Sequence, residues 1–239
     1  MGTAAADRLT HFQITVDAER WLEWAEQKNI HPYVQAYIKQ KPEKLIEENV
    51  FESTIKATPR SWAVVSDYLY KAQEQGLSTQ RQGNQPSDLQ ILLEGRIGQK
   101  NTADFIASIE QYGKLYPPEE YLKALNDSKN PQRLLEMAPI EMTPNFGLIF
   151  SLSEYCAKQD NPVDALIDAM LVFKRFTKCQ DNVNREDMYR SAVSILSGRL
   201  MKQSSFWEVV QNDKFANELS PDVTAIPELK ELEQKAKAA

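Results

Sequence analysis

PVDALIDAMLVFKRFTK, residues 162–178, is the stretch of this sequence that decides the fold class. Its apolar residues recur at the spacing of an α-helix and form one stripe: Val163, Leu166, Ile167, Met170 and Leu171. Phe173 and Phe176 lie outside that stripe, so the helix is apolar on nearly every side. A helix with no polar face buries all of its surface, which predicts that this one is the central helix of a bundle.

Helices are also predicted on both sides of this stretch. A helix over 145–158 precedes it, and Asn184 is a good N-cap residue for a helix over 185–202 that follows it. The tail from Pro227 is highly charged, and we expect it to be exposed. Residues 126–239 are therefore predicted to form a C-terminal helical bundle with a charged tail.

The first half of the chain shows the same kind of pattern. The predicted helices run over 18–28, 32–41, 59–75, 88–97, 102–112 and from within YPPEEYLKAL (116–125). Their N-cap residues are Asp17, Thr58, Ser87 and Asn101. Gly76 and Gly98 are expected to end two of these helices. The chain has only 8 glycines, which also favours a mainly α fold.

One segment near the N-terminus does not fit a helix. HFQITV (11–16) places Phe12, Ile14 and Val16 on one face and polar residues on the other, which is the period of a β-strand. A single strand is not stable without neighbours to pair with. Either this strand lies on the sheet of another chain, or the sequence is a piece of a larger protein.

Composition and the N-terminal sequence argue against several classes of protein. A net charge of −6 argues against nucleic acid as the main partner, because phosphate binding favours a basic surface. No apolar run is long enough to span a membrane, and the N-terminus MGTAAADRL has no secretory pattern, so we expect a cytoplasmic protein. The two cysteines, Cys156 and Cys179, fall inside helical patterns and are expected to be buried as small apolar residues.

Familiar catalytic motifs are missing from the sequence. It contains no glycine-rich phosphate loop and no spacing typical of a metal site. The only histidines are His11 in the predicted strand and His31 before Pro32, and both are expected to be polar surface or turn residues.

An arginine in KATPRSW (56–62) is placed unusually. Thr58 is the predicted cap, Pro59 occupies the first helical position, and Arg60 follows in the first turn. A cation is disfavoured there by up to about 1 kcal/mol because the N-terminus of a helix carries partial positive charge. Arg60 either forms an ion pair with a neighbouring acid or reaches toward a phosphate, which a guanidinium binds bidentately. Arg8, just before the strand, is either a plain surface residue or a second functional arginine.

KATPRSWAVVSDYL resembles the lid segment of MoxR-type AAA+ ATPases, in which a helix opens with a Ser/Thr-Pro-Arg triplet. The resemblance implies that Arg60, together with Thr58 and Pro59, belongs to the nucleotide-binding sensor-two position. DRLTHFQITVD (7–17) is similar to the end of the family's ATPase core, where the residue matching Arg8 is the arginine finger that reaches a neighbouring subunit. The similarity extends over about residues 7–115.

The chain departs from the family in one large respect. The phosphate loop with its lysine and the magnesium-binding acids would lie before Arg8, where this sequence has seven residues. ATP with Mg²⁺ is thus implied for an intact ATPase, and we expect no tight ATP binding and no hydrolysis by this chain alone. The chain is either a fragment, expressed as such or from a split gene, or a degenerate relative that keeps the lid as a scaffold.

The resemblance divides the chain into three parts. Residues 1–17 are the remnant of an α/β ATPase core, residues 18–125 a lid-like helical domain, and residues 126–239 the helical bundle. The implied function is to couple ATP binding and hydrolysis to remodelling of a protein client within a ring of subunits. The alternative is a non-enzymatic helical scaffold or adaptor, in which Arg60 makes a structural ion pair.

Overall fold

A computed structural model describes residues 16–46, 57–76, 86–179, 181, 184–204, 208–209 and 211–219. Helices make up nearly all of the ordered elements in these ranges, and no strand occurs within them, so the prediction of a mainly α protein is confirmed. The predicted strand at 11–16 falls outside these ranges except for Val16, which is exposed. Arg8 also lies outside them.

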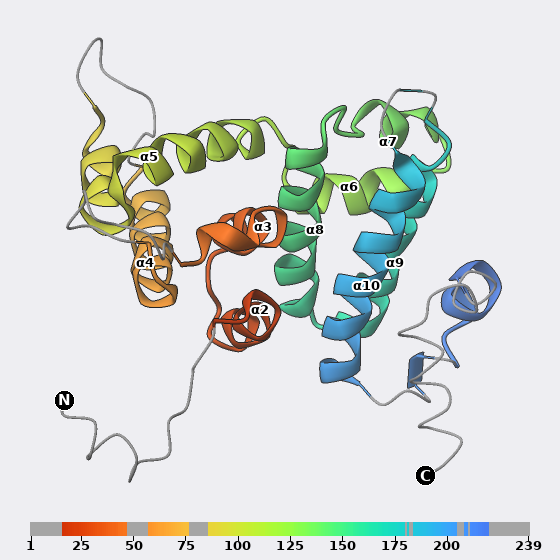
Figure 1. Ribbon diagram of the computed structural model, residues 1–239. Helices are drawn as coiled ribbons and strands as arrows, with labels where there is room; N and C mark the ends of the chain where they lie inside the picture. The colour runs from red at the N-terminus through yellow and green to blue at the C-terminus, as the bar shows by residue number, and fades with distance from the viewer. Residues whose placement is uncertain are drawn as a thin grey trace, which may run out of the picture.

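The first group of helices forms the N-terminal half (Figure 1). It consists of α2 (Ala18–Gln27), α3 (Pro32–Gln40), the 3₁₀ turn η1 (Pro42–Lys44), α4 (Pro59–Gln75) and α5 (Asp88–Tyr112). Several helices begin at predicted caps: the Asp17 carboxylate accepts from the backbone N–H of Glu19 at 2.9 Å, and the Ser87 hydroxyl accepts from that of Gln90 at 3.2 Å. The helix starts predicted at these caps are confirmed.

One aromatic triad lies at the centre of the N-terminal half. The ring of Trp62 is fully buried and lies 5.3 Å from the rings of both Tyr37 and Phe105, measured between centroids. Its indole Nε1 donates to the carbonyl of Lys44 at 2.8 Å, which satisfies the only polar atom of the side chain. The triad joins α3, α4 and α5 into one apolar core.

Helix α5 changes direction at Gly98. This glycine has φ 79° and ψ 159°, a conformation that L-residues with a side chain rarely adopt, and the helix resumes immediately after it. The structure therefore has a kink at Gly98, where the sequence predicted the end of a helix. The predicted cap at Asn101 is wrong, because the helix has already resumed before this residue. The side-chain amide of Asn101 instead donates to the Ile97 carbonyl at 2.9 Å, across the kink.

The C-terminal half contains α6 (Pro118–Leu125), α7 (Gln132–Glu136), α8 (Met142–Ala157), α9 (Pro162–Phe176), α10 (Arg185–Gln203) and the π-turn η2 (Phe215–Leu219). Short connections make α8, α9 and α10 neighbours that lie side by side (Figure 1). Helix α9 contacts α6, α7, α8, α10 and η2, so the prediction that it is a central helix is confirmed. Phe173 and Phe176, outside the predicted stripe, are both buried.

The two halves have separate hydrophobic cores. Tyr121 and Ala124 of α6 belong to the core of the C-terminal half, whereas Ile109 of α5 belongs to the core of the N-terminal half. The division by packing therefore falls between α5 and α6, ahead of the boundary after residue 125 that the sequence predicted. Residues 126–131 connect α6 and α7, two helices of the same half.

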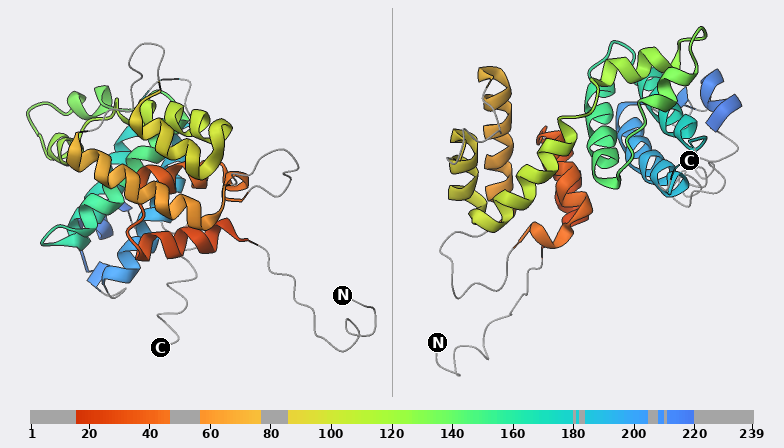
Figure 2. Two further views of the ribbon diagram at one scale, coloured as in Figure 1. Left: turned by 90° about the vertical axis from the view of Figure 1, so that its left-hand side faces the viewer. Right: turned by 90° about the horizontal axis from the view of Figure 1, so that it is seen from above.

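The halves meet where α3 lies across α8 (Figure 2). A small third cluster at this junction contains Ala36 of α3, Tyr112 at the end of α5 and Phe150 of α8. The hydroxyl of Tyr112 accepts a hydrogen bond from the amide of Gln40 at 3.2 Å, and the same amide reaches the Thr143 carbonyl at 3.4 Å. The junction thus combines a few apolar contacts with polar ones.

Gly147 on α8 lets Tyr112 approach closely. A Cβ atom at this position would lie 2.9 Å from Cε1 of the Tyr112 ring and closer still to Cδ1. We predict that Gly147→Ala lowers the free energy of unfolding by about 1–3 kcal/mol, because the fully buried ring has no space to move. The gain of about 0.5–1 kcal/mol that alanine normally brings to a helix is smaller.

Thermal unfolding of Gly147→Ala and of a control, Gly95→Ala, measures this effect. Gly95 is also helical, but nothing lies within 4 Å of its ideal Cβ position, so its replacement is expected to raise the melting temperature. Equal increases for both variants would contradict the close contact.

Candidate functional site

The N-terminus of α4 is built as the sequence predicted. Thr58 is the N-cap, and its hydroxyl accepts from the backbone N–H of Ser61 at 3.1 Å while the Ser61 hydroxyl accepts from the backbone N–H of Thr58 at 2.7 Å. This reciprocal capping box, together with Pro59 in the first helical turn, fixes where the helix begins. The following residue, Arg60, is therefore held at a defined position in the first turn.

Arg60 is exposed at this position. Within the ranges that the structure describes it makes no ion pair, and the first turn of α4 contains no acidic residue. The predicted alternative of a structural ion pair thus finds no partner among those residues. An exposed guanidinium can bind an anion bidentately, and the partial positive charge of a helix N-terminus favours an anion as well.

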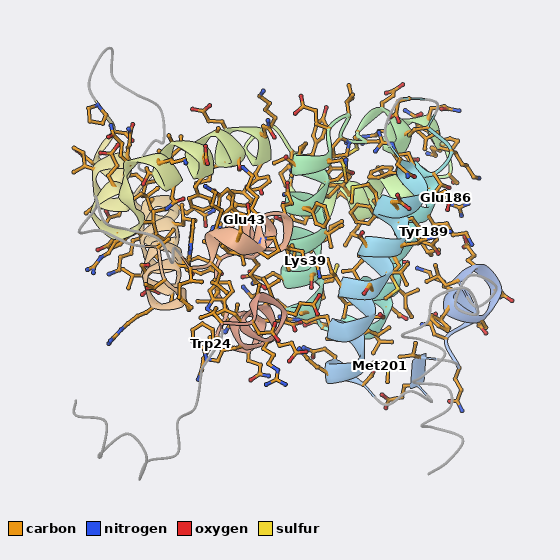
Figure 3. All side chains as sticks on the ribbon, viewed as in Figure 1. Trp24, Lys39, Glu43, Glu186, Tyr189 and Met201 are labelled. Atoms are coloured by element: carbon orange, nitrogen blue, oxygen red, sulfur yellow. The ribbon has the colours of Figure 1, made fainter. Side chains whose placement is uncertain are left out.

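A large cavity lies at the junction between the two halves and not at Arg60. It has a volume of about 610 Å³ and is lined by α2, α3, α8 and α10. Its walls carry acidic side chains such as Glu26 and Glu154 and basic ones such as Lys39 and Arg199, and Phe150 contributes apolar surface. Figure 3 shows Lys39 at this junction between the two halves. We call this cavity the junction cleft.

An ion-pair cluster crosses the junction cleft from α2 to α10. The Glu26 carboxylate lies 2.9 Å from a guanidinium nitrogen of Arg199, and its other oxygen pairs with the ammonium of Lys202. The side chains of Glu26 and Arg199 are only 19% and 14% exposed, so solvent screens this pair less than an ordinary surface salt bridge. The cluster ties α2 of the N-terminal half to α10 of the C-terminal half.

A second polar tie joins α4 to α8. The hydroxyl of Tyr70 donates to both carboxylate oxygens of Glu154, at 3.1 and 3.3 Å, and Lys158 pairs with the same carboxylate at 2.6 Å. Burial and the neighbouring Glu154 charge raise the pKa of the Tyr70 phenol, so this hydroxyl stays protonated and remains a donor.

His31 lies next to this tie and is buried, with 2% of its surface exposed. Its Nδ1 accepts from the backbone N–H of Tyr33 at 3.2 Å and caps α3, and its own backbone N–H donates to the Ser66 hydroxyl at 2.8 Å. The imidazole packs against the rings of Tyr33 and Tyr70 with centroid distances of 4.9 and 4.8 Å. Desolvation lowers the pKa of His31 to about 4, so the ring is neutral at physiological pH. Of the expected alternatives, a surface or a turn residue, the surface position is wrong, and the position in the turn before α3 is confirmed.

The cysteines and metal-binding residues add no reactive site among the residues described. Cys156 is fully buried, as predicted, and desolvation raises its thiol pKa to about 12. Cys179 is only partly buried, and its thiol reaches the Leu135 carbonyl at 3.8 Å. No group of three or more His, Cys, Asp or Glu side chains suited to a metal ion occurs in the ranges that the structure describes.

The residues predicted from sequence and the junction cleft are separate features. Thr58, Pro59 and Arg60 line neither this cleft nor the cavity of about 560 Å³ beside α2. The cross-junction contacts of Glu26 and Tyr70 were not predicted, because each pairs residues more than 80 positions apart and no local pattern signals them. Across the described helices, none is both long and apolar enough to cross a membrane.

Comparison with known proteins found no relative of this chain. No protein-family model, no curated protein and no solved structure matches this chain.

Proposed function

We propose that this chain is the lid and C-terminal helical region of a MoxR-like AAA+ ATPase. The observation that supports this best is Arg60, an exposed arginine without an ion-pair partner among the described residues, fixed in the first turn of α4 by the capping box of Thr58 and Ser61. A cation placed against the helix dipole without a compensating acid is explained if it serves an external anion. Together with the resemblance of KATPRSWAVVSDYL, this makes a nucleotide phosphate the proposed anion.

In this proposal, Arg60 binds the phosphates of ATP held by the ATPase core, and so draws α4 and its neighbours toward that core. Arg8 stabilises charge on the γ-phosphate of a neighbouring subunit as an arginine finger. Hydrolysis releases the Arg60 contact, and the movement remodels a protein client in the cytoplasm. The phosphate-loop lysine and the magnesium ligands come from a core that precedes residue 8, so this chain contributes binding and movement but not hydrolysis.

We predict that Arg60→Ala, made in the full-length ATPase, weakens ATP binding about tenfold to a hundredfold, since hydrogen bonds to charged groups contribute roughly 1.5–3 kcal/mol. Arg60→Lys is expected to restore only part of the affinity, because an ammonium lacks the bidentate geometry. Calorimetric titration with a non-hydrolysable ATP analogue measures both changes.

Arg190→Ala is the matched control, because Arg190 is another exposed helical arginine but lies in α10. It is expected to leave ATP affinity unchanged, and Arg60→Ala is expected to leave the stability of the chain within about 0.5 kcal/mol of the original. Unchanged nucleotide affinity and turnover in Arg60→Ala would falsify the sensor role. For Arg8, recovery of activity when Arg8→Ala subunits are mixed with phosphate-loop mutants, equal to that given by the unmutated arginine, contradicts the finger role.

A second candidate function is a helical scaffold or adaptor without enzymatic activity. The observation in its favour is that Arg60 does not line the junction cleft. This cleft lies between the two halves and is slightly larger than the cavity beside α2. The reading frame upstream of Met1 distinguishes the candidates. An in-frame sequence that encodes a phosphate loop supports the ATPase, and a frame without one supports the scaffold.

A further inference from the structure

One face of α4 makes contacts outside the hydrophobic core of the N-terminal half. Trp62, Val65 and Leu69 point into the hydrophobic core of the N-terminal half. Ser66, Tyr70 and Gln73, at helical spacings of four and three residues, lie on another face. The Ser66 hydroxyl accepts from the His31 backbone N–H, and the Tyr70 ring packs on the His31 ring.

This second face is also where α4 reaches the C-terminal half. The Tyr70 hydroxyl extends past His31 to the Glu154 carboxylate on α8, and Lys158 holds that carboxylate from the next turn. The Glu154 side chain is only 15% exposed, so the hydrogen bond lies largely out of water. A phenol that donates to a shielded carboxylate makes a directional contact that is sensitive to displacements of an ångström.

Among the described residues, no apolar cluster contains residues of both α4 and α8. Their connection is polar and passes through Tyr70 and the N-terminus of α3. A polar contact of this kind breaks and re-forms without exposing apolar surface, whereas separation of a packed core does not. The contact between α4 and α8 is therefore suited to a reversible change.

We propose that the Tyr70–Glu154 hydrogen bond is a latch that transmits displacement of α4 to the C-terminal half. Tyr70 is ten residues from Arg60 on the same helix, which corresponds to about 15 Å along a rigid rod. A pull at one end of α4 therefore moves Tyr70 relative to Glu154. That the pull comes from a nucleotide at Arg60 rests on the proposed function; the latch itself does not.

The junction cleft gives the two halves room to move when the latch opens. Glu154 lines this cleft, and the Glu26 cluster with Arg199 and Lys202 crosses it from α2 to α10. With the latch open, this ion-pair cluster and the contacts of α3 on α8 still hold the halves together. The expected motion is a change in the angle between the halves rather than their separation.

Tyr70→Phe tests the latch in the chain itself, without nucleotide. The substitution removes only the hydroxyl and keeps the ring against His31. Spin labels on cysteines at exposed positions Lys71 in α4 and Glu186 in α10, in a Cys179→Ser background, report the distance between the halves. The buried thiol of Cys156 does not take the label. We expect the original chain to populate mainly one distance with a small share of a second, and that share to be about tenfold larger in Tyr70→Phe.

Tyr68→Phe is the matched control. Tyr68 is on the same helix, and its hydroxyl accepts from Arg96 on α5, inside the N-terminal half, at 3.2 Å. The control is expected to keep the original distance distribution, and Glu154→Gln, which removes the charge, to shift it in the direction of Tyr70→Phe. If Tyr70→Phe keeps the original distribution, or if Tyr68→Phe changes it equally, the latch is overturned. Either result leaves the ATP-binding test of Arg60 untouched, so the two proposals fail separately.

Discussion

Replacement of Trp62 by alanine is expected to lower the free energy of unfolding by about 3–5 kcal/mol. Trp62 is fully buried between Tyr37 and Phe105, and its removal leaves a cavity that the surrounding helices fill only in part. It also leaves the Lys44 carbonyl without its indole donor. Because domains of this kind are stable by about 5–15 kcal/mol, the loss is a large fraction of the total.

Urea unfolding followed by far-UV circular dichroism measures this loss without relying on tryptophan fluorescence. Trp24→Ala is the control, because Trp24 on α2 is 39% exposed, and its replacement is expected to cost under about 1 kcal/mol. Figure 3 labels this side chain on the outer part of α2. A cost for Trp62→Ala no larger than that for Trp24→Ala would show that the aromatic triad is not the core of the N-terminal half.

Acidification is expected to destabilise the protein through His31. The pKa of His31 is about 4 in the folded chain, whereas that of an exposed imidazole is about 6.5. As the pH falls, His31 therefore takes up a proton at a higher pH in the unfolded state than in the folded state. The stability that is fully present above pH 6.5 is lost as the pH falls toward 4. The loss from this group amounts to about 2 kcal/mol at pH 5 and about 3 kcal/mol near pH 4.

His31→Asn isolates this effect, because asparagine is an effective N-cap residue that does not titrate. The variant loses ring packing against Tyr33 and Tyr70 and is expected to be less stable at pH 7. Its stability is nevertheless expected to fall less than that of the original chain between pH 7 and pH 5, by about 2 kcal/mol. Parallel pH profiles for the two proteins would mean that His31 is not held neutral by burial.

The positions of most helices could be predicted because the signals are local. A short polar side chain before an apolar period, as at Thr58 or Asn184, marks a helix start through hydrogen bonds within three residues. The all-round apolar pattern of α9 identified the central helix of the C-terminal half for the same reason. Gly98 was predicted to end a helix, but a single glycine with positive φ also allows a kink after which the helix continues, and packing decides between the two.

The contacts around the candidate site were harder to predict from the sequence. Arg60 was singled out because its conflict with the helix dipole is visible within one turn. The burial of His31 and the pairing of Tyr70 with Glu154 depend on how α4 lies relative to α3 and α8, which no spacing along the chain encodes. The division between the two cores lies between α5 and α6 and not after residue 125 for a related reason. Turn residues mark the ends of helices, whereas the limits of a core depend on which helices pack together.

The placement of α3 has a practical consequence for any attempt to divide the protein. Although α3 lies early in the chain, it packs on α8, more than 100 residues later, and the pair covers Ala36, Tyr112 and Phe150. A truncation between α5 and α6 would leave these side chains facing water on both fragments. An isolated piece that carries such an apolar patch is prone to self-association. The two cores are distinct, but the two halves are not separable modules. Experiments are therefore best carried out on the whole chain.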